Sequence, residues 1–151
     1  MAVLVNGSDS YTLLGTLPLG MALVHHQGDR GHLAGIREEA EALRREPLEP
    51  RALAHLLHFL AFDALSEGGY GRAGALAEEV LALNPQLVNT RDIVRCLIIL
   101  GMIALVRDHE QAVVTFNEGL HLSQKLGDKL FNAYCLLGLA GAEALGGRLG
   151  P

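Results

Sequence analysis

Tryptophan is absent from this 151-residue sequence, aromatic residues make up only 5% of it, and basic residues are outnumbered by acidic ones. The 12 lysines and arginines against 17 aspartates and glutamates give a formal net charge of −5, so the chain lacks the basic footprint of a nucleic-acid-binding domain. The two cysteines, Cys96 and Cys135, lie outside any C-x-x-C motif, which excludes a disulfide framework. We expect both thiols to be buried and unreactive.

Signals for export and for membrane insertion are also missing from the sequence. The first ten residues carry no basic segment and too short an apolar run for a signal peptide. The most apolar stretch, residues 93–106, is interrupted by Arg95. At about 1.5 Å per residue this stretch is shorter than the hydrocarbon core of a bilayer, so it predicts a buried helix. We therefore expect a soluble, cytoplasmic protein.

Apolar residues are abundant, at 50% of the chain, and they recur at spacings of three and four residues. This periodicity predicts amphipathic helices, and the length suits a single domain. A charged stretch within 37–46 has pairs at helical spacing and is interpreted as a solvated helix face. The sequence thus predicts an all-α fold with about seven helices, over residues 10–26, 30–45, 50–67, 70–83, 89–106, 109–125 and 129–145.

The helices are organised as a repeat. Leucines at positions 19, 60, 100 and 137 precede a glycine or alanine and are separated by 41, 40 and 37 residues. A period near 40 with two helices per unit is typical of a helical solenoid. We assign units to residues 10–46, 50–86 and 89–127, and a half unit to 129–145. Small residues are expected where helices cross closely, namely at Ala61, Ala73, Gly101 and Gly138.

Units two and three resemble the tetratricopeptide repeat family. The second unit keeps residues typical of that family, namely Leu60, Gly68, Tyr70, Ala73, Leu81, Leu83 and Pro85. The third keeps Leu100, Gly101, Ala112, Phe116 and Leu120 and extends to Asp128. This longer ending resembles the variant found in bacterial LuxR-type and maltose-regulator-type transcriptional activators and related signal-transduction ATPases. The resemblance implies antiparallel hairpins stacked in a right-handed superhelix, with the first helix of each hairpin on the concave side.

A groove for a peptide, a helix or another domain follows from that arrangement. The first helices would contribute a set that is apolar in its middle and polar at one end: Met21, His25, His55, His58, Phe62, Arg95, Ile98, Met102, Asn132 and Cys135. The same groove could instead hold a small-molecule inducer, or these side chains could simply pack between neighbouring helices.

No sequence motif of an enzyme, a metal site or a cofactor site is present, so none is assigned. His55 and His58 stand three residues apart and could chelate a metal with help from His25 or His26, but groove or surface histidines are the preferred interpretation. The sequence therefore predicts a non-enzymatic regulatory module that binds a protein or peptide, or other domains of a parent chain, without contacting nucleic acid or membrane itself.

The last helix, 129–145, has apolar residues on more than one face and no following partner helix in the sequence. We expect this end to self-associate as a two-fold dimer, since soluble monomers rarely expose large apolar patches. The residues predicted to carry the contact are Leu130, Ala133, Leu136, Leu137 and Ala140.

Overall fold

The computed structural model describes residues 30–83 and 85–147 of the chain. The described part contains helices and their connections, without any strand. The helices are α2 (Arg30–Arg44), α3 (Pro50–Ser66), α4 (Tyr70–Leu81), α5 (Thr90–Leu105), α6 (His109–Leu126) and α7 (Lys129–Gly147). The all-α prediction is confirmed, and six of the seven predicted helices are present with ends within two residues. The helix predicted over 10–26 lies outside the described residues.

Local capping explains where these helices begin and end. Pro50 stands in the first turn of α3, where its missing N–H costs nothing. The side chains of Asn89 and Asp108 cap α5 and α6 by accepting hydrogen bonds from the backbone N–H groups of Arg91 and Gln111. Gly127 ends α6 with a φ of 67°, a left-handed conformation that favours glycine. The last helix, predicted to end at residue 145, continues through Gly147.

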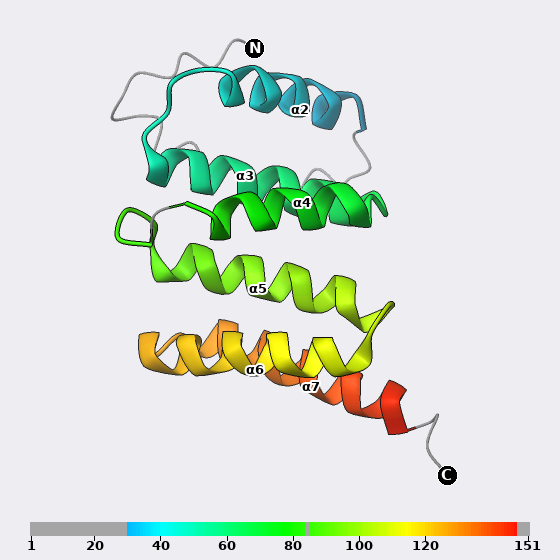
Figure 1. Ribbon diagram of the computed structural model, residues 1–151. Helices are drawn as coiled ribbons and strands as arrows, with labels where there is room; N and C mark the ends of the chain where they lie inside the picture. The colour runs from blue at the N-terminus through cyan, green and yellow to red at the C-terminus, as the bar shows by residue number, and fades with distance from the viewer. Residues whose placement is uncertain (1–29, 84, 148–151) are drawn as a thin grey trace.

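The helices form a stack from α2 at one end to α7 at the other (Figure 1). Two antiparallel hairpins, α3–α4 and α5–α6, make up the middle, and α5 packs on both helices of the preceding hairpin. In the same way, α7 packs on both α5 and α6. The first helices therefore form one row, in which α5 contacts α3 on one side and α7 on the other.

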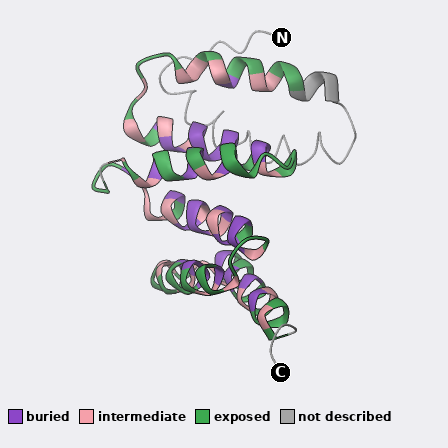
Figure 2. Cartoon of the chain, turned by 45° about the vertical axis from the view of Figure 1, so that its right-hand side comes forward, coloured by how far each residue is buried: buried purple, intermediate pink, exposed green. Residues whose placement is uncertain are grey.

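Burial is concentrated in the middle of the stack (Figure 2). One core joins α3, α4 and α5, where Ala61 and Ala73 are fully buried. A second, smaller core surrounds Phe116 between α5, α6 and α7. Gly101 and Gly138 both lie against the ring of Phe116, so the expectation of small residues at close crossings is confirmed for these two glycines.

Candidate interaction surface

The buried positions of α3, α5 and α7 reveal the register of the repeat. In each helix four buried residues recur with spacings of four, three and four. These sets are Ala52, Leu56, Phe59 and Asp63 in α3; Asp92, Cys96, Ile99 and Ile103 in α5; and Phe131, Cys135, Gly138 and Ala142 in α7. Corresponding residues are thus 40 apart between α3 and α5, as predicted, but 39 apart between α5 and α7. Leu100 and Leu137, which are 37 residues apart, therefore do not occupy corresponding positions of the buried sets.

The predicted surface residues of α3 and α5 occupy matching positions in this register. They form the pairs His55 and Arg95, His58 and Ile98, and Phe62 and Met102. Because α3 contacts α5, each pair begins a row that runs across the first helices. Phe62 and Met102 are 38% and 45% exposed, and His55, Arg95 and Ile98 are half-buried. His58 is buried and belongs to the floor of the surface.

On α7 the rows continue through residues that the sequence analysis missed. The register of the buried residues places Tyr134 and Leu137 in the positions predicted for Asn132 and Cys135, and Gly141 in the position that Met102 has on α5. Tyr134 and Leu137 are 50% and 70% exposed, whereas Cys135 is fully buried. Asn132 accepts a hydrogen bond from the Ser123 hydroxyl at 2.5 Å and so ties α7 to α6. The prediction of a surface position is therefore wrong for Cys135, and the register of the buried residues differs by two from the one that places Asn132 beside Arg95.

A buried carboxylate lies beneath the row formed by His55, Arg95 and Tyr134. Asp92 is fully buried, and its Oδ1 accepts a hydrogen bond from Arg95 at 3.1 Å. Asp92 Oδ2 lies 3.2 Å from His55 Nε2, a contact that becomes an ion pair when the imidazole is protonated. The Arg95 guanidinium lies over the ring of Phe131 at 5.7 Å, in range for a cation–π interaction. This polar cluster connects α3, α5 and α7 and fixes the row that they share.

The same surroundings control two neighbouring titratable groups. Burial, followed by repulsion from Arg95, lowers the pKa of His58 to about 4, so this imidazole is neutral near pH 7. Burial and the nearby Asp92 carboxylate raise the pKa of the Cys96 thiol to about 12. Burial also raises the pKa of Cys135. Both cysteines are buried and protonated, as the sequence analysis predicted.

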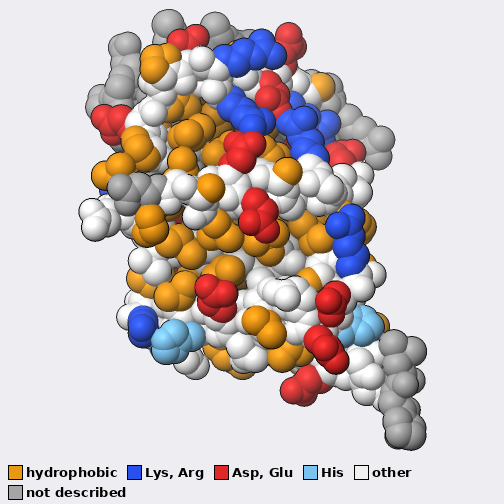
Figure 3. Space-filling model, in the orientation of Figure 1, with side chains coloured by type: hydrophobic (Ala, Val, Ile, Leu, Met, Phe, Trp, Pro, Cys, Tyr) orange, Lys and Arg blue, Asp and Glu red, His pale blue; other side chains and the backbone are white. Residues whose placement is uncertain are grey.

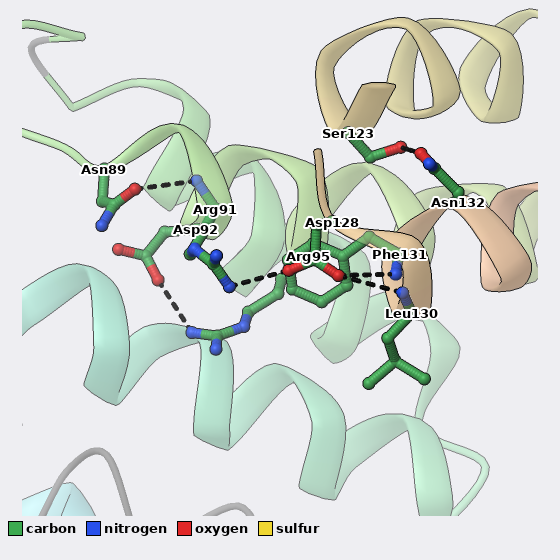
Figure 4. Close-up of polar contacts among 9 residues, drawn as sticks. All are labelled: Asn89, Arg91, Asp92, Arg95, Ser123, Asp128, Leu130, Phe131 and Asn132. Atoms are coloured by element: carbon green, nitrogen blue, oxygen red, sulfur yellow. Dashed lines mark hydrogen bonds and ion pairs between the residues drawn. The ribbon is translucent and has the colours of Figure 1, made fainter. Parts of the chain in front are cut away.

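A second polar link holds the α6–α7 connection against α5 (Figure 4). Arg91 pairs with Asp128 Oδ2 at 2.7 Å. The other carboxylate oxygen of Asp128 accepts hydrogen bonds from the backbone N–H groups of Leu130 and Phe131, which caps the start of α7. Asp128 therefore fixes both where α7 begins and how it sits on α5.

Charged side chains gather where α2 meets the α3–α4 hairpin (Figure 3). Arg37 pairs with Asp63 at 2.6 Å and with Glu67 at 2.8 Å. Arg44 pairs with Glu79 on α4 at 2.5 Å, and Arg72 on α4 pairs with Glu41. The charged stretch predicted as a solvated face thus forms ion pairs between helices, which no spacing within α2 could indicate.

The ion pairs of Arg37 and the pair of Arg72 with Glu41 border a cavity of about 760 Å³ between α2, α3 and α4. Its lining includes the arginines at 37, 45 and 72 and the carboxylates of Glu38, Glu41, Asp63 and Glu67. Asp63 Oδ1 is buried there without a hydrogen-bond partner in the described part of the chain. The cavity is large enough for a small polar molecule.

The remaining predicted residues belong to the groove, to a possible metal site and to the self-association surface. Met21 and His25 lie outside the described residues, as does His26. Among residues 30–83 and 85–147, no group of three or more histidine, cysteine or carboxylate side chains is arranged to hold a metal ion. The five predicted self-association residues, Leu130, Ala133, Leu136, Leu137 and Ala140, are all exposed on α7.

No family model matches the chain, and neither a curated protein nor a solved structure matches it.

Proposed function

We propose that this chain is a non-enzymatic interaction module, a tetratricopeptide-like scaffold that binds a peptide or helix of a protein partner across α3, α5 and α7. The observation that carries the proposal is the set of rows that cross these helices at matching repeat positions. Three consecutive first helices present the same face, so a bound segment would contact each of them in turn. Extended repeat surfaces of this kind are used for recognition.

The chemistry of the rows suits an amphipathic segment. Phe62, Met102 and Leu137 offer an exposed apolar surface, and methionine adapts easily to different partner side chains. His55, Arg95 and Tyr134 line one side with groups that can donate hydrogen bonds. The Asp92 carboxylate holds Arg95 in place, which reduces the entropy lost when a partner binds.

The parent context is also part of the proposal. The repeat of about 40 residues supports a right-handed superhelix and a role within a cytoplasmic bacterial transcriptional regulator or signalling ATPase. In such a protein, the bound segment could belong to a partner or to another domain of the same chain. We assign no cofactor, metal or catalytic residue to the module.

Peptide selection followed by targeted variants tests the binding surface. Peptides selected on the full chain from a random library would be measured against Met102→Glu, with Val114→Glu as the matched control on α6, since Val114 is 59% exposed. A charge within the exposed apolar surface of Phe62, Met102 and Leu137 should weaken peptide binding by about tenfold or more. Selected peptides that bind Met102→Glu and Phe62→Glu as tightly as the wild type would contradict the proposal.

Small-molecule sensing is a second candidate, and the cavity beneath α2 is the observation that favours it. Its volume and its arginine and carboxylate lining suit a compact polar ligand better than a peptide. A metabolite screen by thermal shift distinguishes the two, because a ligand at 100 times its dissociation constant adds about 2.7 kcal/mol to the unfolding free energy. Loss of that shift in Arg45→Ala, with peptide binding unchanged, would assign the ligand to the cavity.

A further inference from the structure

The exposed side of α7 corresponds to positions that are covered in the two preceding first helices. In α3 the residues Ala54, Leu57, Ala61 and Ala64 are buried, and in α5 so are Val94, Leu97, Gly101 and Ala104. In α5 this side faces α6, since Gly101 lies against Phe116 and Gly119 lies against Leu97. The register places Ala133, Leu136, Ala140 and Glu143 in the same positions on α7, and all four are exposed. This is the face on which the second helix of a hairpin packs.

We define the open face of α7 as Lys129, Ala133, Leu136, Ala140 and Glu143. Within the described residues no helix covers it, and Leu136 is 53% exposed. Leu130 and Leu137 border it and are 61% and 70% exposed. The apolar side chains exposed at the centre and border of this face are costly in water, and a helix packed on them would remove the cost.

We propose that a second copy of the chain covers the open face, with the two α7 helices packed antiparallel about a two-fold axis at Leu136. Each α7 would then take the place that α4 has on α3 and that α6 has on α5. The contact is self-complementary, as a two-fold interface must be.

The order of residues on the open face supports this occupant. Lys129 and Glu143 each lie seven residues from Leu136, one on either side. They are about 21 Å apart along their own helix, at about 1.5 Å per residue, so they cannot pair with each other within one copy. In the antiparallel arrangement, Lys129 of each copy lies beside Glu143 of the other. Ala133 and Ala140 flank the axis, and their small side chains let the two helices approach closely.

A membrane is the other occupant that the composition of α7 suggests. Of the described helices, α7 is the one that is long and apolar enough by composition to cross a bilayer. Its opposite side is nevertheless built into the stack, since Phe131, Cys135 and Ala142 are buried and Gly138 lies against Phe116. Insertion would break these contacts, whereas pairing with a second copy leaves them intact.

Charge reversal tests both the partner and the register. Sedimentation of the full chain at concentrations up to about 100 μM should show a dimer. Lys129→Glu and Glu143→Lys should each weaken dimerisation by about tenfold through like-charge contacts, and the double variant should restore it. Circular dichroism would confirm that each variant keeps its helices. Val114→Glu, an exposed substitution on α6, is the matched control and should dimerise like the wild type.

Cross-linking provides a second readout that does not depend on charge. Leu136→Cys places a thiol on the proposed axis and should form a disulfide-linked dimer under mild oxidation. Lys129→Cys should not, because an antiparallel pair separates these positions. A monomer at about 100 μM, failure of the double charge variant to restore the dimer, or efficient linking through position 129 would overturn the proposal. Flotation of the wild-type chain with phosphatidylcholine vesicles, in place of dimerisation, would assign α7 to the membrane.

Discussion

The ring of Phe116 on α6 lies directly on the backbone of Gly138 on α7, in the space that any side chain at position 138 would need. The same ring also lies against Gly101 on α5, where an added Cβ would lie 2.7 Å from Phe116 Cε1. Phe116 is 1% exposed, so the ring has little room to move away. One aromatic side chain therefore sets the spacing of three helices.

Gly138→Ala should destabilise the chain although alanine is the better helix former. Overpacking costs about 1–3 kcal/mol, against a gain in helix propensity of about 1 kcal/mol. Gly35→Ala on α2 is the matched control, because a Cβ there meets nothing within 4 Å, and it should be neutral or stabilising. Urea unfolding measures both. A Gly138→Ala variant as stable as Gly35→Ala would show that α7 does not pack on Phe116 in this way.

The two glycines also show what the sequence could and could not predict. Helix positions followed from apolar periodicity and from capping residues, which act locally. The Leu-Gly pairs at 100–101 and 137–138 look equivalent, but Gly101 faces the partner helix of its own hairpin and Gly138 faces the preceding hairpin. Aligning these two Leu-Gly pairs places corresponding residues of α5 and α7 37 positions apart. The 4-3-4 spacing of apolar residues from Phe131 to Ala142 gives 39 and would have found Tyr134.

Two other features depend on contacts between helices. Asp92 lies at a core position of the repeat, where periodicity alone would expect an apolar residue. Its partner Arg95 is three residues away on α5, but its other partner, His55, comes from α3. The ion pairs of Arg37 reach residues 26 and 30 positions away. Such contacts depend on how helices are placed in space, so a single sequence does not reveal them.

His58 should make the stability of the chain depend on pH. Its pKa falls from 6.5 to about 4 on folding, so the unfolded chain binds the proton more tightly. The contribution of His58 to the free energy of unfolding is complete above pH 6.5 and is lost as the pH falls towards 4. The loss amounts to up to about 3 kcal/mol, because one pKa unit corresponds to about 1.36 kcal/mol. His58→Gln should flatten this part of the profile, whereas His121→Gln, an exposed control on α6, should not. Urea unfolding from pH 4 to pH 8 measures the difference.

Attachment of α2 should be sensitive to salt. Among its described side chains only Ala40 is fully buried, and ion pairs from Arg37, Arg44 and Glu41 connect it to α3 and α4. At about 0.5 M NaCl the Debye length falls well below its value of about 10 Å at 0.1 M, which weakens exposed pairs. Hydrogen exchange should therefore accelerate in α2 more than in α5. Equal acceleration in both helices would contradict an electrostatic attachment.

The two thiols should report separately on the opening of the stack. Both are fully buried, and the raised pKa of Cys96, about 12, suppresses its thiolate, so neither should react with a thiol reagent at pH 8 while the chain is folded. Cys135 lies on α7, which within the described residues of one copy packs on one side only, whereas Cys96 lies in the core shared by α3, α4 and α5. Local opening of α7 costs less free energy than global unfolding, so Cys135 should react first, at denaturant concentrations below the main transition. Labelling followed by peptide mass analysis gives both rates. Simultaneous labelling would mean that α7 and the α3–α5 core unfold as one cooperative unit.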